Sequence, residues 1–318
     1  MSNSFDTALG LKNLKTKELT NLRIMETLYY KVAGFTYSII FADDNNTSEL
    51  IQSSEPFKID APEAGTELIF TLTVDDAFRP KQKGGEIGQF DCGGCNHGVY
   101  QMEDGTYQIL ISNEMQEQCC ILECKGDFSE GHLALNGDYR MRNFGLNNAL
   151  MLMYAFSTAP HNTLLMHSSV VRKDGKGYMC LGVSGTGKST HTGLWLKYIE
   201  GTDLMNDDNP VVRITDDGVA RVYGSPWSGK TPCYRNVEAP IGAFIQLRQA
   251  PYNKITPENT IEAFSSLLPS CSVMKWDGRL YKFICSTIGQ IISKVPNYLL
   301  ECLPDEDAAK LSSSTCCR

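Results

Sequence analysis

The first part of the chain alternates short apolar runs with clusters of turn-forming residues. The apolar runs occupy residues 28–32, 37–41, 68–74, 107–111 and 119–122, and turn signals stand at residues 43–46, 84–85 and 104–105. Short runs bounded by Gly, Asn and Asp are typical of β-strands. The pattern therefore predicts a β-rich, mostly antiparallel N-terminal lobe over residues 1–142.

Beyond residue 142, helical periodicity alternates with short apolar segments. A helix is predicted over residues 143–156, where it joins the two lobes and is ended by Pro160. Apolar segments on either side of the Asp174-Gly175 turn predict a β-hairpin. The remaining predictions are helices over 190–198, 260–268 and 280–293, a short strand before residue 207, a core strand over 241–247, and a last helix from residue 304 with a frayed tail after 311. We therefore expect an α/β domain over residues 143–318.

Residues 182–189 read GVSGTGKS and fill every fixed position of the phosphate-binding pattern G-x-x-x-x-G-K-[ST]. The motif stands between a predicted strand and a predicted helix, which is the context it requires. Glycines let the backbone turn tightly, so that successive N–H groups form an anion site at the positive end of the helix. Lys188 is expected to contact the β- and γ-phosphates, and the Ser189 hydroxyl to bind Mg²⁺. The expected nucleotide-binding residues are Gly182, Ser184, Gly185, Thr186, Gly187, Lys188, Ser189 and Thr190.

Two adjacent carboxylates, Asp207 and Asp208, end the short strand that follows the helix after the loop. A right-handed strand–helix–strand crossover brings the second strand back parallel to the first. The aspartates are then expected at the sheet edge that holds the phosphate loop. Carboxylates beside a triphosphate hold Mg²⁺, act as a base for the acceptor, or do both.

The order of these features resembles the catalytic domain of HPr kinase/phosphorylase and the related ATP-dependent phosphoenolpyruvate carboxykinases. The shared order is a His167-bearing strand, a hairpin, the loop GVSGTGKS, a helix and a short strand that ends in Asp-Asp. The likeness covers about residues 160–300 and does not extend to the N-terminal half. It implies an α/β fold with a phosphoenolpyruvate carboxykinase-like P-loop kinase core and a mixed sheet over residues 143–318, beside the β-rich N-terminal lobe.

The resemblance also implies roles for individual residues. The loop binds the phosphates of ATP, with Ser189 and Asp208 near Mg²⁺, while Asp207 acts as general base toward an acceptor hydroxyl. His167 matches the histidine that assists this base. A histidine that is only a buried, hydrogen-bonded part of a strand is the alternative for His167.

The segment 224–236 is rich in turn formers and cations. Its Arg235 and Lys230 are candidates to neutralise charge on a transferred phosphoryl group. Arg235-Asn236 resembles part of the HPr kinase signature, but the full signature is absent, so the acceptor stays open. The alternative is a packed surface turn built on Trp227, Pro232 and Tyr234.

A cysteine motif in the N-terminal half carries less information than the phosphate loop. Cys92 and Cys95 form a C-x-x-C with His97 two residues later, which suits a zinc site or a redox pair. No second C-x-x-C or His pair completes the set at customary spacing, so a glycine-rich hairpin turn is the default interpretation.

Composition limits the cellular setting and the partners. The net charge of −8 provides no general attraction for nucleic acid, and no stretch approaches the length of a membrane span or shows a signal-peptide pattern. The twelve cysteines are dispersed in a long chain, several of them in apolar runs, which favours reduced thiols. We expect a cytoplasmic protein without nucleic-acid or membrane partners.

The sequence therefore predicts a Mg²⁺-dependent ATP phosphotransferase that acts on a hydroxyl of a protein serine or a small alcohol. An ATP-binding regulatory or accessory protein with little or no transfer activity is the alternative from another class. Carboxykinase activity is a third candidate, but it would need a carboxylate-binding arginine for which the N-terminal half offers no recognisable match. Related kinases assemble into rings, so the resemblance also leaves homo-oligomerisation open.

Overall fold

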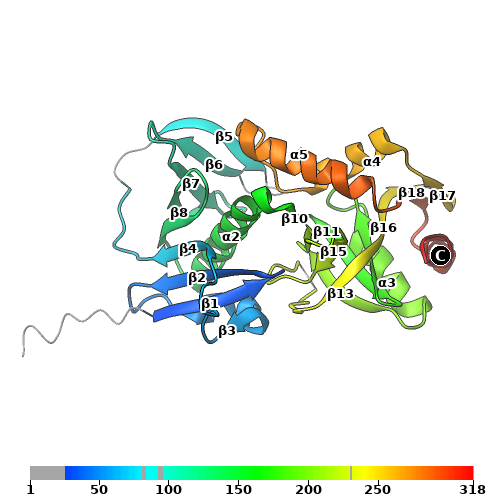
Figure 1. Ribbon diagram of the computed structural model, residues 1–318, viewed down its shortest axis with the longest axis horizontal. Helices are drawn as coiled ribbons and strands as arrows, with labels where there is room; N and C mark the ends of the chain where they lie inside the picture. The colour runs from blue at the N-terminus through cyan, green and yellow to red at the C-terminus, as the bar shows by residue number, and fades with distance from the viewer. Residues whose placement is uncertain (1–25, 81–83, 92–95, 230, 318) are drawn as a thin grey trace, which may run out of the picture.

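The computed structural model describes residues 26–80, 84–91, 96–229 and 231–317, which form two mixed β-sheets with helices packed on them (Figure 1). The chain is therefore α/β, as predicted. In Figure 1 the N-terminal sheet lies at one end of the molecule and the C-terminal sheet at the other, and helix α5 (Gly278–Ile292) extends along both. Within the described ranges, no helix combines the length and apolar character that crossing a membrane requires.

The strands of the N-terminal half form one mostly antiparallel sheet, as the apolar runs predict. All of its neighbouring strands are antiparallel except the pairs β2–β4 and β4–β9. Strands β3, β5, β6 and β9 lie outside the predicted runs, and in β5 and β6 Gly and polar residues interrupt any apolar run. In spatial order the strands are β3 (Lys58–Ile59), β1 (Glu26–Val32), β2 (Phe35–Phe41), β4 (Leu68–Val74), β9 (Glu130–Leu135), β8 (Gln118–Cys124), β7 (Tyr107–Ser112), β6 (Asn96–Gln101) and β5 (Gly85–Asp91).

Helix α2 (Tyr139–Thr158) packs against β4, β8 and β9 of this sheet (Figure 1). Asp138 caps its first turn by accepting a hydrogen bond from the Met141 backbone N–H. The helix is longer than the predicted 143–156. Pro160 lies in the 3₁₀ turn η3 (Ala159–His161) that follows, so the predicted stop is confirmed. A further 3₁₀ segment, η2 (Ser48–Phe57), also contacts α2.

The C-terminal sheet carries the phosphate-loop motif. Its strands are β10 (Thr163–Leu165), β14 (Val211–Ile214), β15 (Ala220–Tyr223), β16 (Glu238–Gln249), β12 (Lys176–Leu181), β11 (Ser168–Lys173) and β13 (Asp203–Asp208), with β18 (Asn297–Cys302) and β17 (Lys254–Pro257) joined through β16. The helices of this part are α3 (Lys188–Tyr198), α4 (Thr260–Leu267), α5 and α6 (Glu306–Cys316), with a short 3₁₀ turn η4 (Leu268–Ser270) after α4.

Strand directions in this sheet agree with the predicted crossover. β12 is parallel to β16, and β16 is parallel to β18. β11 pairs antiparallel with both β12 and β13, so β13 runs parallel to β12 with β11 between them. The loop that follows β12 and the aspartates that end β13 therefore lie at the same edge of the sheet.

Two predicted boundaries are wrong. The single His167-bearing strand that was expected is two strands, because β10 pairs with β14 while β11 pairs with β12 and β13. His167 lies in the break, where its backbone N–H donates to the Ser270 carbonyl at 2.6 Å. The tail after residue 311 is not frayed, because α6 continues to Cys316 and buries Ser312 against α3.

The buried residues form two clusters. One runs from the N-terminal sheet through α2 to α5, and the other lies where α3 and α6 cover β12, β16 and β18. The cysteines among the described residues are free thiols.

Candidate functional site

The phosphate loop connects β12 to α3 through a tight turn. Gly182, Gly185 and Gly187 take φ values of +146°, +81° and +107°, which side chains rarely adopt, so these positions favour glycine. Ser184 and Gly185 are exposed, as are Ser189 and Thr190 in the first turn of α3. The first turn of α3, whose backbone N–H groups have no partner within a helix, is thus partly exposed, as an anion site requires.

The Lys188 side chain is buried, whereas Val183, Ser184 and Ser189 are exposed. The Lys188 Nζ donates to the carbonyl oxygens of Gly182 at 2.9 Å and Val183 at 3.4 Å. Burial lowers the pKa of Lys188, while the negative charges of Asp208 and Asp207 act in the opposite direction. Lys188 is therefore close enough to Asp207 and Asp208 for their charges to interact.

Asp207 lies on the α3 side of the sheet. It is directly opposite Ser169 on β11, and the Ser169 hydroxyl contacts the Thr192 hydroxyl of α3 at 2.8 Å. Residues opposite each other on neighbouring antiparallel strands share a face, so Asp207 faces the helix that begins with Lys188. Asp207 is only 5% exposed.

Asp208 pairs with His167. The His167 Nδ1 and an Asp208 carboxylate oxygen are 2.8 Å apart, and their side chains are 45% and 30% exposed. The alternative of a buried strand histidine is therefore wrong. The resemblance implied that His167 assists Asp207, whereas the close contact that the structure shows is with Asp208.

The oxygen donors at this edge fit a magnesium ion. Ser189 supplies a hydroxyl on the exposed first turn of α3, and Asp208 supplies a partly exposed carboxylate. Mg²⁺ prefers one or two carboxylate or hydroxyl ligands together with substrate phosphates and water. Within the described ranges, no group of three or more His, Cys, Asp or Glu is placed to hold an ion alone.

A cavity of about 690 Å³ adjoins the loop. Its wall includes the loop backbone at 185–187, Thr190 and Leu194 of α3, Gln249 at the end of β16, and Leu303 after β18. The Gln249 amide donates weakly to the Gly185 and Thr186 carbonyls, at 3.4 Å each. A volume of this size suits a drug-sized ligand.

The sequence patterns point to neither Gln249 nor Leu303. One signal was available, because ligands in open α/β sheets bind beyond the carboxyl ends of parallel strands. The predicted strand over 241–247 ends two residues before Gln249, which gives that residue the expected position.

Arg235 is not brought to this site. Its guanidinium pairs with Asp203 at 2.6 Å and with the Leu204 carbonyl, and Arg172 holds the same Asp203 carboxylate at 2.9 Å. Asp203 begins β13, whereas the aspartate pair ends it, so Arg235 lies at the far end of the strand. Lys230, the other cation predicted here, lies outside the described residues.

The cysteine motif is described only in part. Cys92 and Cys95 lie outside the described residues, while His97 is 1% exposed on β6. Its Nδ1 accepts a hydrogen bond from the Ser112 backbone N–H at 3.4 Å, and burial lowers its pKa. This environment is that of a neutral core histidine.

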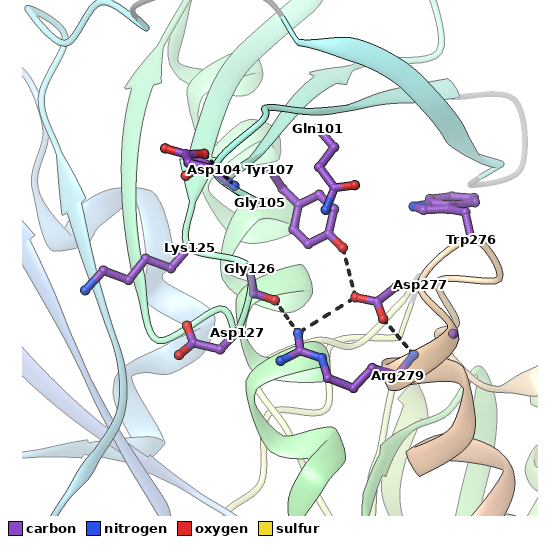
Figure 2. Close-up of a pocket in the computed structure, with 12 residues that line it drawn as sticks. Gln101, Asp104, Gly105, Tyr107, Lys125, Gly126, Asp127, Trp276, Asp277 and Arg279 are labelled. Carbon is purple, nitrogen blue, oxygen red and sulfur yellow. Dashed lines mark hydrogen bonds and ion pairs between the residues drawn. The ribbon is translucent and has the colours of Figure 1, made fainter.

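A second cavity of about 620 Å³ lies between the N-terminal sheet and the start of α5 (Figure 2). In Figure 2 the Tyr107 hydroxyl points to Asp277 and donates to its carboxylate at 2.8 Å. Arg279 donates to the Gly126 carbonyl at 2.5 Å, and Lys125 pairs with Glu130 at 2.6 Å. The bonds of Tyr107 and Arg279 link the N-terminal sheet to the start of α5, so this part of the cavity wall is a polar joint between the sheet and α5.

Comparisons with known proteins add no assignment. No protein-family model matches the chain, and a search of curated proteins finds no match.

Proposed function

We propose that this chain is a Mg²⁺-dependent phosphotransferase that moves the γ-phosphate of ATP to an acceptor hydroxyl, on a P-loop kinase core of the phosphoenolpyruvate carboxykinase-like type. The observation that carries the proposal is the meeting of three groups at one sheet edge. Lys188 stands at the start of α3, with Asp207 and Asp208 at the end of the strand parallel to β12. Kinase sites need this combination, because their catalysis consists of positioning and charge stabilisation.

In the proposed reaction, Asp207 accepts the proton of the acceptor hydroxyl. The acceptor oxygen forms a bond to the γ-phosphorus while the bond from that phosphorus to the β–γ bridging oxygen breaks, and ADP leaves with the bond's electron pair. Lys188 and the loop N–H groups hold the phosphates in line.

Ser189 and Asp208 would hold Mg²⁺, which when bound neutralises phosphate charge. His167 orients the Asp208 carboxylate through the 2.8 Å contact, as partners of ligating carboxylates commonly do.

The cavity beside the loop supports a nucleotide as the donor. Its volume exceeds what phosphate groups alone need, and Leu194 and Leu303 supply apolar surface for a base. We therefore expect ATP to bind more tightly than tripolyphosphate, which a calorimetric comparison in Mg²⁺ would measure. Equal affinities would indicate a donor without a nucleoside.

The test of function is a set of variants assayed with labelled ATP, proteins and small alcohols. Lys188→Ala should abolish the thermal shift by Mg·ATP, which for a ligand at 100 times its Kd is worth about 2.7 kcal/mol. Asp207→Asn should retain ATP binding and lose about 10²- to 10⁴-fold in transfer rate, because the base is removed.

Asp203→Asn is the matched control for Asp207→Asn, since it removes a carboxylate at the opposite end of the same strand. Full activity of Asp207→Asn would refute the base assignment. Binding of Mg·ATP by the wild type without hydrolysis or transfer would favour an ATP-binding regulatory protein.

A further inference from the structure

The strand end that carries Asp207 and Asp208 is held by a buried polar network. Asn206 is fully buried, and its side-chain oxygen accepts from the Asp208 backbone N–H at 3.1 Å. Its Nδ2 donates to the Ser225 hydroxyl and to the Trp227 carbonyl, each at 3.2 Å. One buried amide therefore connects the backbone of the aspartate pair to a distant segment.

That segment, residues 225–229, is here named the strap. It runs along the outer side of β13, where Asp208 and Ser228 form a β-bridge and the Gly229 N–H donates to the Asp207 carbonyl at 2.8 Å. Ser225 is fully buried, and its hydroxyl donates to the Asn209 carbonyl at 2.6 Å. The strap thus contacts backbone groups of residues 207, 208 and 209.

Gly229 shows how closely the strap approaches the aspartates. A Cβ at this position would lie 3.1 Å from the Asp207 carbonyl oxygen and 3.2 Å from the Asp208 Cβ. Both distances are tighter than ordinary side-chain contacts, so a larger residue would displace the strap or the aspartates.

The strap is also anchored to the other sheet. Trp227 is 6% exposed, and its ring packs on the ring of Tyr154 with centroids 5.2 Å apart. Tyr154 belongs to α2, which covers the N-terminal sheet, and its hydroxyl donates to the Val32 carbonyl of β1 at 3.0 Å. A continuous chain of contacts therefore leads from the N-terminal sheet to the aspartate pair.

We propose that Asn206 and the strap are positioning elements for the aspartate pair, and that the Trp227–Tyr154 contact makes the N-terminal sheet part of the site's support. This inference rests on the proposed phosphotransferase function and assigns the N-terminal half a task within it. The network reaches the aspartates only through their backbone, so it sets their position without replacing their chemistry.

Asn206→Ala tests the network. The expected result is a fall of about 10- to 100-fold in kcat for Mg·ATP turnover, the range found for groups that orient a ligating or reacting side chain. Affinity for ATP without Mg²⁺ should stay near the wild-type value, because Asn206 bonds to the Asp208 backbone and to the strap rather than to the phosphate loop. Asn297→Ala is the control, since Asn297 is another buried amide of the same sheet, 6% exposed, that donates to the Val295 carbonyl.

Equal kcat values for the Asn206 and Asn297 variants, with only their melting temperatures lowered, would overturn the proposal. If the wild type binds Mg·ATP without turnover, the readout is the gain in ATP affinity on adding Mg²⁺. That gain should shrink in Asn206→Ala and persist in Asn297→Ala, and an unchanged gain in both would again overturn it.

The anchor is tested with Trp227→Phe and Trp227→Ala. Phe keeps an aromatic ring against Tyr154 and should restore most of the kcat that Ala loses, whereas equal kcat in both variants would refute the anchor. If the Ala variant does not fold, Gly229→Ala replaces it, because Gly229 is exposed and its new Cβ presses directly on the aspartates. A wild-type kcat in Gly229→Ala would then refute the positioning role.

Two different results would refute the proposed function and the positioning role. Absence of Mg·ATP binding and turnover in the wild type would refute the proposed function and the positioning role with it. Wild-type turnover that the strap variants leave unchanged would refute the positioning role alone.

Discussion

Acidification should destabilise the fold through His191, which is buried between α3 and the C-terminal helix. The residue is 3% exposed, and its Nε2 lies 3.0 Å from the Ser312 hydroxyl and 3.2 Å from the Trp195 indole Nε1. Because the indole N–H can only donate, Nε2 acts as an acceptor and the ring is neutral. Burial lowers the pKa of His191 from its ordinary 6.5 to about 4.

Acid destabilises the folded chain because the folded and unfolded states bind a proton at His191 over different pH ranges. Between pH 6.5 and about 4 the unfolded chain binds a proton at His191 and the folded chain does not. The contribution of the neutral His191 to stability is therefore fully present above pH 6.5 and is lost as the pH falls toward 4. Each pKa unit corresponds to 1.36 kcal/mol, so the total loss attributable to His191 is about 3 kcal/mol.

The assay is urea unfolding in metal-free buffer from pH 7.5 to pH 4, for the wild type and for His191→Gln. The amide keeps a hydrogen-bond acceptor near Trp195 but does not titrate. Other carboxylates and histidines contribute equally to both proteins, so the difference between the two curves isolates His191. Parallel curves over this interval would refute the assignment of a buried neutral imidazole.

Two further predictions concern contacts away from the phosphate loop. Tyr107→Phe removes the hydrogen bond to Asp277 and should cost about 1–3 kcal/mol of unfolding free energy, because the bond is partly buried and ends on a charged group. Chemical denaturation measures this cost, with the exposed Tyr139→Phe as the control. A cost no larger than that of Tyr139→Phe would contradict the joint between the sheet and α5. Arg235→Ala should cost only about 0.2–1 kcal/mol, because its partner Asp203 is 38% exposed. A fall of two orders of magnitude in transfer rate for Arg235→Ala would instead restore its sequence-predicted role at the phosphates.

Local patterns account for much of the fold around the loop. The glycines, Lys188 and the following helix were predictable because the motif specifies a strand, a turn and a helix within one short segment. The return of β13 parallel to β12 was predictable from the handedness of the crossover. The hairpin was predictable from Asp174-Gly175, which takes φ values of +50° and +74°.

Features that depend on register or distant packing were not predictable. Which aspartate contacts His167 depends on the alignment of β11 with β13, which shifts between Val170 and Val171. The serine-rich end of α6 has weak helix propensity, yet it is helical because Ser312 bonds to His191 and Trp195. Arg235 was predicted near the phosphates, but its partner Asp203 lies at the opposite end of the strand from Asp207 and Asp208.

The strand β11, which lies between β12 and β13, has a consequence for protein engineering. It places the loop strand and the aspartate strand two inter-strand spacings apart, about 9.6 Å, where direct neighbours would be separated by half that distance. Lengthening or shortening surface loops cannot alter this separation, because it is fixed by strand count. The loop, Lys188 and both aspartates are thus carried by one uninterrupted stretch, residues 168–208, but a transplant onto another scaffold would also need His167 and the strap, which lie outside that stretch.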